Sequence, residues 1–593
     1  MPSRPCFLGV SQSLNGRRWV LRPSDERTAL ALSQRLGLPE VAGRVLAGRG
    51  VGLDEAEDFL NPTLKNLLPD PSSLQDMDVA VARLVRAVRE GQTIGVFGDY
   101  DVDGATSTAV LVRFFSSLGL RVLTHIPDRQ AEGYGPNLAA LKSLKERGAG
   151  VVITVDCGIT AFVPLEEAEK AGVEVIVVDH HEAEPKLPAS LAAVNPNRLD
   201  DTSGQGHLAA VGVTFLLVVA LNRALRQAGW YGAGRAEPDL MQWLDLVALG
   251  TVCDVVPLRG LNRALVTQGL KVLGQRRNVG LKALSEIAAI DEPPTAYHLG
   301  FILGPRINAG GRVGQASLGA NLLTCDDPAQ ALEMARRLEA YNAERRELEA
   351  AILLEAIEQV ERDPDPDQPF VFAASAAWHP GVVGIVASRL KDRYAMPSCV
   401  AAIEGGLVKG SGRSVRGVDL GSVIIAARQS GLLVAGGGHA MAAGFTVEES
   451  RLDEFRAFMT ERLRAFSPEG GFAPTLEVDG VVGVTGATPD LVEALSKIGP
   501  FGAGNAEPRF VVAEARVLKA DVVGMGHVRC ELSGVNGGRL KAIAFRSVDS
   551  ELGLTLLNGA GRTLHLAGTL KSDTWKGRND VQMFIEDAAP AGV

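Results

Sequence analysis

From about residue 91, largely apolar runs alternate with longer segments of helical periodicity. The apolar runs occupy 93–97, 121–127, 150–156 and 173–179, and amphipathic segments separate them. This alternation is typical of βαβ units, in which helices cover both faces of a mostly parallel sheet. We therefore predict a doubly wound α/β domain here.

A different pattern follows in the second half of the chain. Residues 328–362 are charged on one face of a helix and apolar on the other, and Pro364 and Pro366 end this long connecting helix. A second, smaller α/β unit is expected at about 368–465. Beyond about 472, five or six strands with short loops suggest a small β-barrel, with the OB-fold as the leading candidate.

These patterns predict five regions. They are an N-terminal region (1–80), the parallel-sheet domain (81–275), a helical connector containing GPRINAGGR (276–366), the smaller α/β domain (367–468) and the barrel (469–593). The N-terminal region carries no chemical cluster, so we assign it no function.

Composition limits the possible classes of protein. A chain of 593 residues is too long for one core, and 46% apolar with 22% charged residues excludes a mostly disordered or fibrous protein. The net charge of -10 argues against coating nucleic acid by bulk attraction. It leaves room for a local basic groove.

The cysteines and the apolar runs indicate the compartment. Six scattered cysteines without a CxxC pair suggest neither disulfides nor a zinc site. No secretory signal is visible, and the apolar run at 208–221 is short enough to be a buried helix. We expect a cytoplasmic protein without a membrane span.

Three acids at alternate positions follow the first apolar run. In GDYDVDGATST, residues two apart in an extended chain point the same way, so Asp99, Asp101 and Asp103 would converge. Their charges would repel unless a cation lay between them. A divalent metal ion is therefore the expected ligand.

Further acids and histidines follow the later apolar segments. Asp156 ends one run, Asp179, His180 and His181 end the next, and Asp254 follows another apolar segment. One aspartate at a strand end is more often a turn former or a helix cap. The joint occurrence favours a ligand site, because the carboxyl ends of parallel strands meet at one edge.

The mixture of ligands indicates the ion. Carboxylates and imidazoles without thiolate suit Mn²⁺ or Mg²⁺, and the imidazoles favour Mn²⁺. So many acids exceed the need of one ion. Two ions that share an aspartate could activate a water and stabilise a leaving oxygen, which predicts hydrolysis of a phosphoester.

The motifs resemble a known family. GDYDVDGATSTA, ITVDCGIT, VVDHH and ALGTVCDVVPL are similar to successive motifs of the DHH phosphoesterase superfamily. GPRINAGGR, WHPGVVGIVASRL, GGHAMAAG and GPFGAGNAEPRF resemble those of RecJ, the single-stranded-DNA-specific exonucleases with DHH and DHHA1 domains. The resemblance covers about 90–593.

The resemblance implies the residues of the site. The two metal ions would be held by Asp99, Asp101, Asp103, Asp156, His180, His181 and Asp254, with Asp179 in support. Asp156, His181 and Asp101 would be catalytic: Asp156 as the bridging acid, His181 as a phosphate-orienting group or proton donor, and Asp101 as the favoured ligand of the triplet.

The resemblance also implies residues that hold phosphate or DNA. They are Arg129, Arg306, Asn308, Arg312, His379, Ser411, Arg413 and His439. In the barrel, Trp575 is a candidate for stacking on a base, because the charged residues beside it favour exposure. Arginine suits a terminal phosphate because its guanidinium donates several hydrogen bonds. The alternative is that these arginines brace Gly-rich loops through backbone carbonyls. His379 and His439 are expected on a DHHA1 domain facing the metals across a cleft.

The resemblance implies a single-stranded-DNA-specific 5′-to-3′ exonuclease that releases 5′-mononucleotides and acts in recombination and repair. A monomer that contacts a single-strand-binding protein and a repair helicase is expected. One alternative is a DHH phosphodiesterase of short oligonucleotides or cyclic dinucleotides, although such enzymes generally lack the long N-terminal part and the barrel. The other is a non-catalytic replication factor with a degenerate DHH core.

Overall fold

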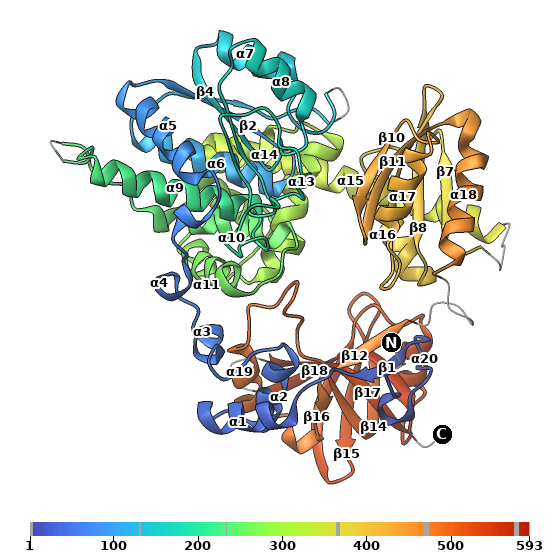
Figure 1. Cartoon of the computed structure of the whole chain (residues 1–593). Coiled ribbons are helices and arrows are strands. Elements are labelled where there is room, and N and C mark those ends of the chain that lie inside the picture. Colours follow the sequence, from blue (N-terminus) through green and yellow to red (C-terminus); the bar gives the residue numbers. More distant parts are fainter. Residues whose placement is uncertain are drawn as a thin grey trace. The chain divides into compact units, whose positions relative to one another are not determined.

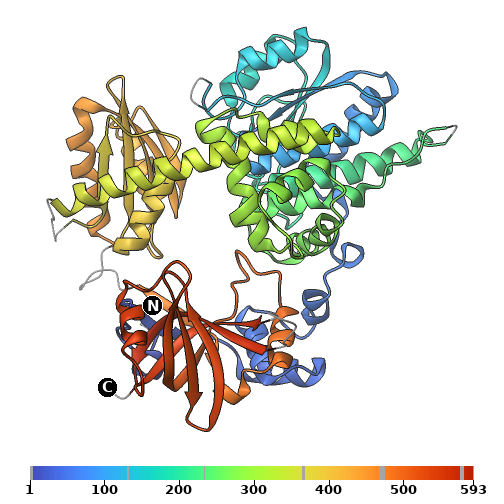
Figure 2. The ribbon, with the colours of Figure 1, turned by 180° about the vertical axis from the view of Figure 1, so that it is seen from behind.

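The computed structural model of the chain describes residues 4–129, 132–232, 234–362, 368–466, 474–573 and 580–591. The chain divides into two compact units. The first comprises Met1–Asn15, Trp19–Glu339 and Leu476–Val593, and the second Gly16–Arg18 and Ala340–Thr475. The long helix α15 (Pro328–Arg362) is the continuous element that carries the chain from one unit to the other, as predicted (Figure 2).

The first unit contains a five-stranded parallel sheet in the order β3-β2-β4-β5-β6 (Figure 1). Its strands are β2 (Thr93–Gly98), β3 (Val122–His125), β4 (Ala149–Val155), β5 (Val175–Val178) and β6 (Ala192–Val194). All residues of β5 and β6 are buried, as expected for a parallel sheet covered on both faces.

Helices cover both faces of this sheet. One face carries α7 (Leu138–Glu146) and α8 (Phe162–Lys170), whose Leu141, Leu144 and Leu165 share a core with Phe97 and Val152 of the sheet. The other carries α5 (Met77–Arg89), α6 (Val102–Ser117) and α9 (Ala210–Gln227). This is the predicted doubly wound arrangement.

Among the described residues, one helix is long and apolar enough to cross a membrane by length and composition. It is α9, and 72% of its apolar window is buried inside the fold. Its neighbours are α5, α6 and α10 (Leu244–Cys253). The helix therefore packs as the buried core helix that its sequence predicted.

Further helices follow α9 in the first unit. They are η3 (Leu240–Trp243), α10, α11 (Gly260–Gly274), α12 (Val279–Ile287), the π-helix η4 (His298–Leu303), α13 (Gly304–Val313) and α14 (Leu318–Thr324). Helix α10 packs on α6 and α11.

The C-terminal strands of the first unit form a closed barrel. They are β13 (Gly480–Val481), β14 (Phe510–Val523), β15 (His527–Gly534), β16 (Gly537–Ala544), β17 (Thr563–Asp573) and β18 (Asp580–Pro590). The order is β13-β14-β15-β16-β18-β17, and β14 also pairs with β17, which closes the barrel. The helices α19 (Pro489–Ser496) and α20 (Glu551–Leu557) accompany it.

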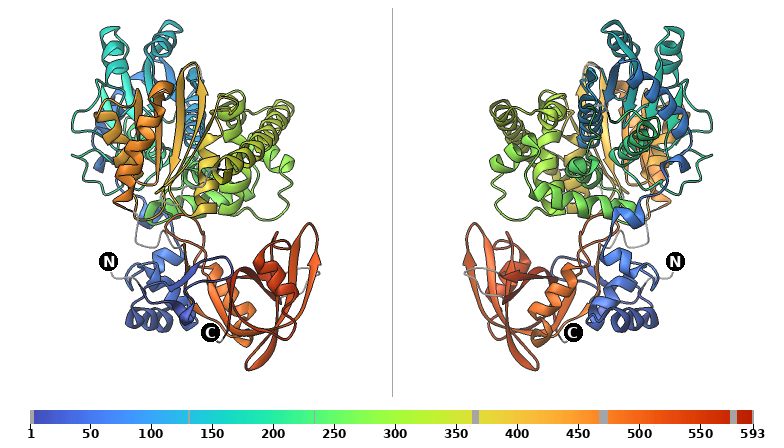
Figure 3. Two further views of the ribbon diagram at one scale, coloured as in Figure 1. Left: turned by 90° about the vertical axis from the view of Figure 1, so that its right-hand side faces the viewer. Right: turned by 90° about the vertical axis from the view of Figure 1, so that its left-hand side faces the viewer.

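The N-terminal region packs on this barrel (Figure 3). Its elements are η1 (Phe7–Gly9), β1 (Arg18–Leu21), α1 (Glu26–Leu36), α2 (Glu40–Gly48), α3 (Ala56–Leu60), α4 (Leu64–Leu67) and η2 (Pro71–Ser73). Leu32 and Leu46 join the barrel core, and β1 pairs with β12 (Thr475–Val478). Residues 4–60 and the barrel thus share apolar cores, which their separation in sequence conceals.

The second unit is a smaller α/β fold. Its five-stranded sheet has the order β10-β11-β9-β8-β7, in which β7 and β8 run parallel and the other pairs are antiparallel. The strands are β7 (Val371–Ser375), β8 (Ser398–Glu404), β9 (Leu407–Arg413), β10 (Ala435–His439) and β11 (Ala442–Glu448). Helices α16 (Val383–Tyr394), α17 (Leu420–Gln429) and α18 (Leu452–Arg464) accompany them.

Candidate metal centre and phosphate-binding residues

The carboxyl edge of the parallel sheet gathers the acids and histidines singled out from the sequence. Asp99 follows β2, Asp156 follows β4 and Asp179 follows β5, and these three strands are neighbours in the sheet. All three side chains are almost fully buried. Asp254 reaches the same place from the end of α10.

Three overlapping groups of potential ligands occur there. Within each group the ligand atoms lie within 4.8 Å of one another. The groups are Asp99, Asp101 and Asp156; Asp103, His180 and Asp254; and Asp156, His180 and His181. The structure therefore brings together all seven predicted metal ligands, and Asp156 belongs to two of the groups.

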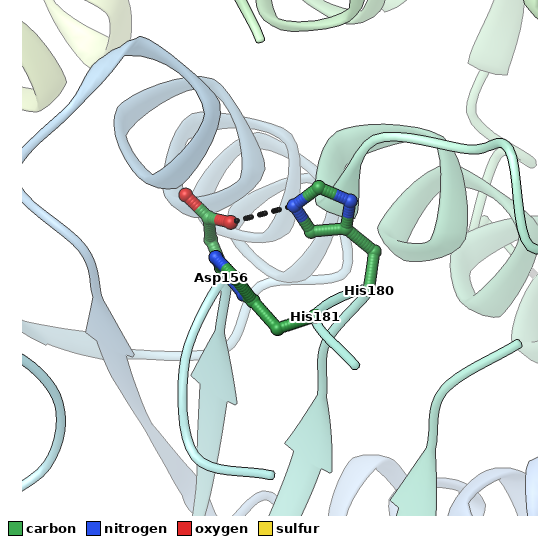
Figure 4. Close-up of side chains that lie close together, drawn as sticks. All are labelled: Asp156, His180 and His181. Atoms are coloured by element: carbon green, nitrogen blue, oxygen red, sulfur yellow. Dashed lines mark ion pairs between the residues drawn. The ribbon is translucent and has the colours of Figure 1, made fainter. Parts of the chain in front are cut away.

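His180 lies at the middle of this arrangement. Its Nε2 is 3.4 Å from Oδ1 of Asp156 (Figure 4) and 3.6 Å from Oδ2 of Asp254. The backbone of Asp156 has a left-handed φ of 61°, a conformation that non-glycine residues adopt mainly where the surrounding structure requires it.

The electrostatics of the cluster favour a bound cation. Burial raises the pKa of Asp99 and Asp156, and repulsion from Asp101 adds to both shifts. Burial, with repulsion from Asp103 and Asp101, raises the pKa of Asp254 to about 9. A divalent cation would offset the repulsion and let these carboxylates ionise together.

Three buried atoms of the cluster have no hydrogen-bond partner: Oδ1 of Asp99, Oδ2 of Asp254 and Nε2 of His180. Buried polar atoms are normally satisfied, so unsatisfied atoms that belong to one cluster need a common explanation. Carboxylate oxygens with imidazole nitrogen and no thiolate fit Mn²⁺ or Mg²⁺. The donors present thus fit the predicted ions.

The three acids of the opening triplet have different surroundings. Oδ1 of Asp101 caps α6 by accepting the amides of Asp103 at 2.8 Å and Gly104 at 3.1 Å. Its other oxygen makes neither of these contacts. The two oxygens of Asp103 instead accept the amides of Ala210 at 2.7 Å and Val211 at 2.8 Å, at the start of α9. Asp101 thus keeps an oxygen for a metal more readily than Asp103.

Glycine at 104 lets α6 begin close to the first strand end. A Cβ at this position would lie 2.5 Å from the carbonyl oxygen of Asp99 and 2.6 Å from its amide nitrogen. Any larger residue would push the helix away from the Asp99 backbone. The glycine of DVDG therefore allows Asp99 and Asp101 to share one site.

A group of residues outside the metal set orients the histidines. Asp179 accepts a hydrogen bond from Nδ1 of His181 at 2.7 Å and another from the amide of Ile159 at 3.0 Å. Asn195 donates to the carbonyl of His181 at 2.8 Å, and Asn197 donates to that of His180. Neither asparagine was predictable from the sequence, because VNPNR alone does not indicate which backbone groups they meet.

The two histidines carry different charges. Burial lowers the pKa of His180 to about 4, so this ring is neutral near pH 7. Burial also opposes the charge on His181, but the hydrogen bond and charge of Asp179 outweigh it and raise the pKa to about 9. His180 is thus suited to bind a metal, and His181 can donate a proton or a hydrogen bond.

Two tyrosines lie beside the cluster, and the sequence analysis singled out neither. The hydroxyl of Tyr134 is 3.3 Å from the carbonyl oxygen of Asp156 and 3.4 Å from Nε2 of His181. The guanidinium of Arg129 lies 5.4 Å from the centroid of the Tyr100 ring. Burial raises the pKa of Tyr100 to about 12, and the charges of Arg129 and Arg312 oppose that rise.

Arg306 matches the bracing alternative for the arginines. It forms an ion pair with Glu339 and donates to the carbonyl of Ile302 at 2.7 Å. Asn308 and Arg312 lie on the same helix, α13, with half-buried side chains. Phosphate contacts of these three residues remain predictions.

Within the second unit, the sheet gathers three predicted phosphate ligands on one face. Arg413 of β9 and His439 of β10 both pair with Ala442 of β11, so they occupy one row across the sheet. Ser411 is two residues from Arg413 and accepts a hydrogen bond from its Nη1 at 2.8 Å. Side chains on one row, or two apart on one strand, share a face.

The start of helix α16 lies against the same face. A Cβ on Gly384 would be 3.0 Å from Oγ of Ser411 and 3.1 Å from Nη2 of Arg413. His379, in the turn before this helix, accepts the amide of Gly381 at 3.1 Å. Serine, arginine and a helix N-terminus form a suitable anion site.

The two tryptophans Trp378 and Trp575 differ in what the structure describes. Trp378, in the WHPG turn, is buried and donates Nε1 to Glu355 at 2.7 Å, so it is part of the packing of the second unit. Trp575 lies outside the described residues, and its contact with DNA remains a prediction.

Three family models match the chain in succession. They are the N-terminal domain of the DHH family at 93–251, the DHHA1 domain at 367–465 and the RecJ OB domain at 478–587. The single-stranded-DNA-specific exonuclease RecJ of Dickeya dadantii is 38% identical, over 93% of this chain and 96% of that relative. The chain belongs to the RecJ family.

Solved structures agree with this assignment to the RecJ family. RecJ from Thermus thermophilus in complex with Mn²⁺ has a TM-score of 0.79 at 31% identity, covering 97% of this chain and 80% of that chain. An exonuclease RecJ bound to manganese has a TM-score of 0.56 at 37% identity, covering 66% of this chain and 95% of that chain. The predicted family, fold class and metal type are confirmed.

Proposed function

We propose that this chain is a metal-dependent exonuclease that degrades single-stranded DNA. The observation that carries the proposal is the convergence of unsatisfied atoms from Asp99, His180 and Asp254 beside Asp156. The RecJ relatives at 34–38% identity are named as single-stranded-DNA-specific exonucleases. A complete ligand set disfavours a non-catalytic replication factor.

Each part of the site has a role in this proposal. Two Mn²⁺ or Mg²⁺ ions would be held by the seven predicted ligands, and would supply an activated water and charge stabilisation for phosphoester hydrolysis. Asp156 belongs to two ligand groups and is the proposed bridging acid. His181, held protonated by Asp179, donates to a phosphate oxygen or to the leaving oxygen.

We extend the proposal to the direction of degradation. Removal of 5′-mononucleotides requires recognition of a terminal phosphate, and Ser411 with Arg413 at the start of α16 provides suitable donors. Action in recombination and repair in the cytoplasm, as a monomer that works with a single-strand-binding protein and a helicase, follows the resemblance alone.

The test uses purified protein with Mn²⁺ and three substrates: a long 5′-phosphorylated single strand, the same strand in a blunt duplex, and a dinucleotide. We expect mononucleotides from the single strand and little cleavage of the duplex. Asp156→Ala should abolish turnover but leave strand binding measurable, whereas the exposed Glu358→Gln should behave as the unmodified protein. Rapid cleavage of dinucleotides without attack on long strands would instead favour the oligonucleotide phosphodiesterase.

A further inference from the structure

Two stacked aromatic rings are exposed on the π-helix η4 and the residue before it. The side chains of Tyr297 and Phe301 are 60% and 73% exposed, and Phe301 is the most exposed aromatic side chain among the described residues. Their ring centroids are 5.2 Å apart with an interplanar angle of 26°. The pair therefore presents a flat aromatic surface to the solvent.

This exposure is unusual for rings of this size. Burying a phenylalanine typically contributes about 1.5–3 kcal/mol, and neighbouring Leu299 and Leu303 are fully buried. Because the rings stack on each other, one face of each is covered and an outer face stays open. An open aromatic face is the surface on which a nucleobase stacks.

The same helix leads from the aromatic pair to the metal centre. Leu303 and Gly304 keep helical dihedral angles, so η4 continues into α13 without a break. Phe301 and Arg312 are eleven residues apart on this continuous helix, which is close to three turns, so they lie on nearly the same side of it. The distance from Phe301 to Arg312 along the axis is about 16 Å.

The far end of this helix contacts the loop that carries the first acids. A Cβ on Gly311 would lie 2.8 Å from the carbonyl oxygen of Tyr100 and 3.3 Å from its Cβ. Tyr100 lies between Asp99 and Asp101 in the sequence, so the helix face ends directly beside the proposed metal ligands. A strand that leaves the metal centre along this face would reach the aromatic pair.

The charges around the pair indicate how such a contact would work. Tyr297 lines a cavity of about 550 Å³ together with Phe501, Pro294 and Lys571. Lys571 forms an ion pair with Glu507. The lysine of this cavity is thus neutralised by an acid, and stacking would dominate over attraction to phosphate.

We propose that Tyr297 and Phe301 form a stacking platform for a base of the single strand, several nucleotides from the bond that is cut. The proposal rests on the proposed exonuclease function and adds a binding subsite to it. The platform would increase the affinity for long strands and would leave short substrates, which end before it, unaffected.

The first test compares substrates of different length. With Phe301→Ala, we expect KM for a long single strand to rise about ten- to one-hundred-fold at unchanged kcat, because stacking contributes about that much per base. KM for a dinucleotide should not change. The matched control is Leu199→Ala, which removes an apolar side chain that is 75% exposed. Tyr297→Phe keeps the ring and should retain the affinity of the unmodified protein.

The second test measures the salt dependence of binding and the position of the contact. In an Asp156→Ala background, Phe301→Ala should lower affinity at every salt concentration without changing the slope of log affinity against log salt. A strand carrying 2-aminopurine at successive positions should show strong quenching at one position, and Phe301→Ala should remove it.

The outcomes separate this proposal from the function on which it rests. If the unmodified protein does not degrade single strands, the proposed function fails. If it does, and Phe301→Ala has no effect on long strands, affects dinucleotides equally or changes the salt slope, the stacking platform is wrong. Unchanged thermal midpoints would show that the exposed substitutions leave the fold intact, and Phe301→Trp should restore binding if stacking is the cause.

Discussion

Nδ1 of His180 donates a hydrogen bond to the carbonyl oxygen of Leu208 at 3.1 Å. A carbonyl oxygen can only accept, so the proton of the neutral ring resides on Nδ1 and the lone pair of Nε2 faces Asp156 and Asp254. The backbone just before α9 therefore determines which nitrogen His180 offers to a metal.

The asparagines that hold the histidine backbone should affect metal affinity. Asn195→Ala and Asn197→Ala each remove one amide donor to a histidine carbonyl, so we expect Mn²⁺ affinity to fall about ten- to one-hundred-fold. Isothermal titration calorimetry with Mn²⁺ alone measures this directly. Asn321→Ala, at an exposed position, is the control. If the Asn195 and Asn197 variants bind Mn²⁺ as tightly as this control, then the two asparagines have no role in metal binding.

The acids of the triplet should differ in their effects on stability. In Asp101→Asn the amide oxygen can still cap α6, and one negative charge disappears from the acid cluster. In the unmodified protein, both oxygens of Asp103 accept hydrogen bonds from amides at the start of α9. In Asp103→Asn, the side-chain NH₂ group would face one of these amides, and the lost hydrogen bond typically costs about 1–3 kcal/mol. Without metal, we expect a higher thermal midpoint for Asp101→Asn than for Asp103→Asn. Equal midpoints would contradict the assignment.

Metal binding should release protons at neutral pH. The pKa of Asp254 is raised to about 9 and that of Asp103 to about 7, by burial and by repulsion from other acids, so without metal at pH 7 Asp254 is protonated and Asp103 is about half protonated. An ion needs the charged carboxylates, so Mn²⁺ affinity should fall as the pH is lowered from 8 to 6. Calorimetry in buffers of different ionisation enthalpy counts the protons, and identical heats would refute the prediction.

The same shifts predict how metal stabilises the fold. A carboxyl group with a raised folded pKa makes the metal-free protein less stable as the pH rises from the unfolded pKa to the folded one. Mn²⁺ removes that cost by pairing with the charge. The increase in thermal midpoint on adding Mn²⁺ should therefore be larger at pH 8 than at pH 5, and the reverse order would contradict the assignment of these acids to the site.

The sequence predicts those parts of the site that follow from local pattern. We could predict that Asp99, Asp156 and Asp179 lie together, because each follows a strand and parallel strands share a carboxyl edge. Tyr134, Asn195 and the Leu208 carbonyl were not predictable, since their contacts depend on loop paths that no periodicity records.

The fold shows the same division. The βαβ alternation and the long helix at 328–362 were predicted from apolar spacing alone. The packing of the N-terminal region on the barrel was not, because Leu32 and Leu46 meet residues more than four hundred positions away. Long-range pairing of two apolar faces leaves no local signal in either segment.

Asp245 should make the domain less stable at high pH. It lies in the first turn of α10, the helix that presents Asp254, and its side chain is almost fully buried and accepts a hydrogen bond from the amide of Leu246 at 2.8 Å. Burial raises its pKa to about 6, although the Leu246 amide and the charge of Arg113 oppose the rise. Between about pH 4 and pH 6, the Asp245 carboxyl group is therefore protonated in the folded state and deprotonated in the unfolded chain. Stability falls across that window, by about 3 kcal/mol for a shift of about two units.

Asp245→Asn removes the charge and keeps the acceptor for the Leu246 amide. We therefore expect its thermal midpoint to exceed that of the unmodified protein at pH 8 and to match it at pH 4. The exposed Asp549→Asn should show no such difference between the two pH values. If Asp245→Asn instead lowers the thermal midpoint equally at pH 4 and pH 8, the prediction is wrong. The charged carboxylate of Asp245 would then stabilise α10, the helix that carries Asp254.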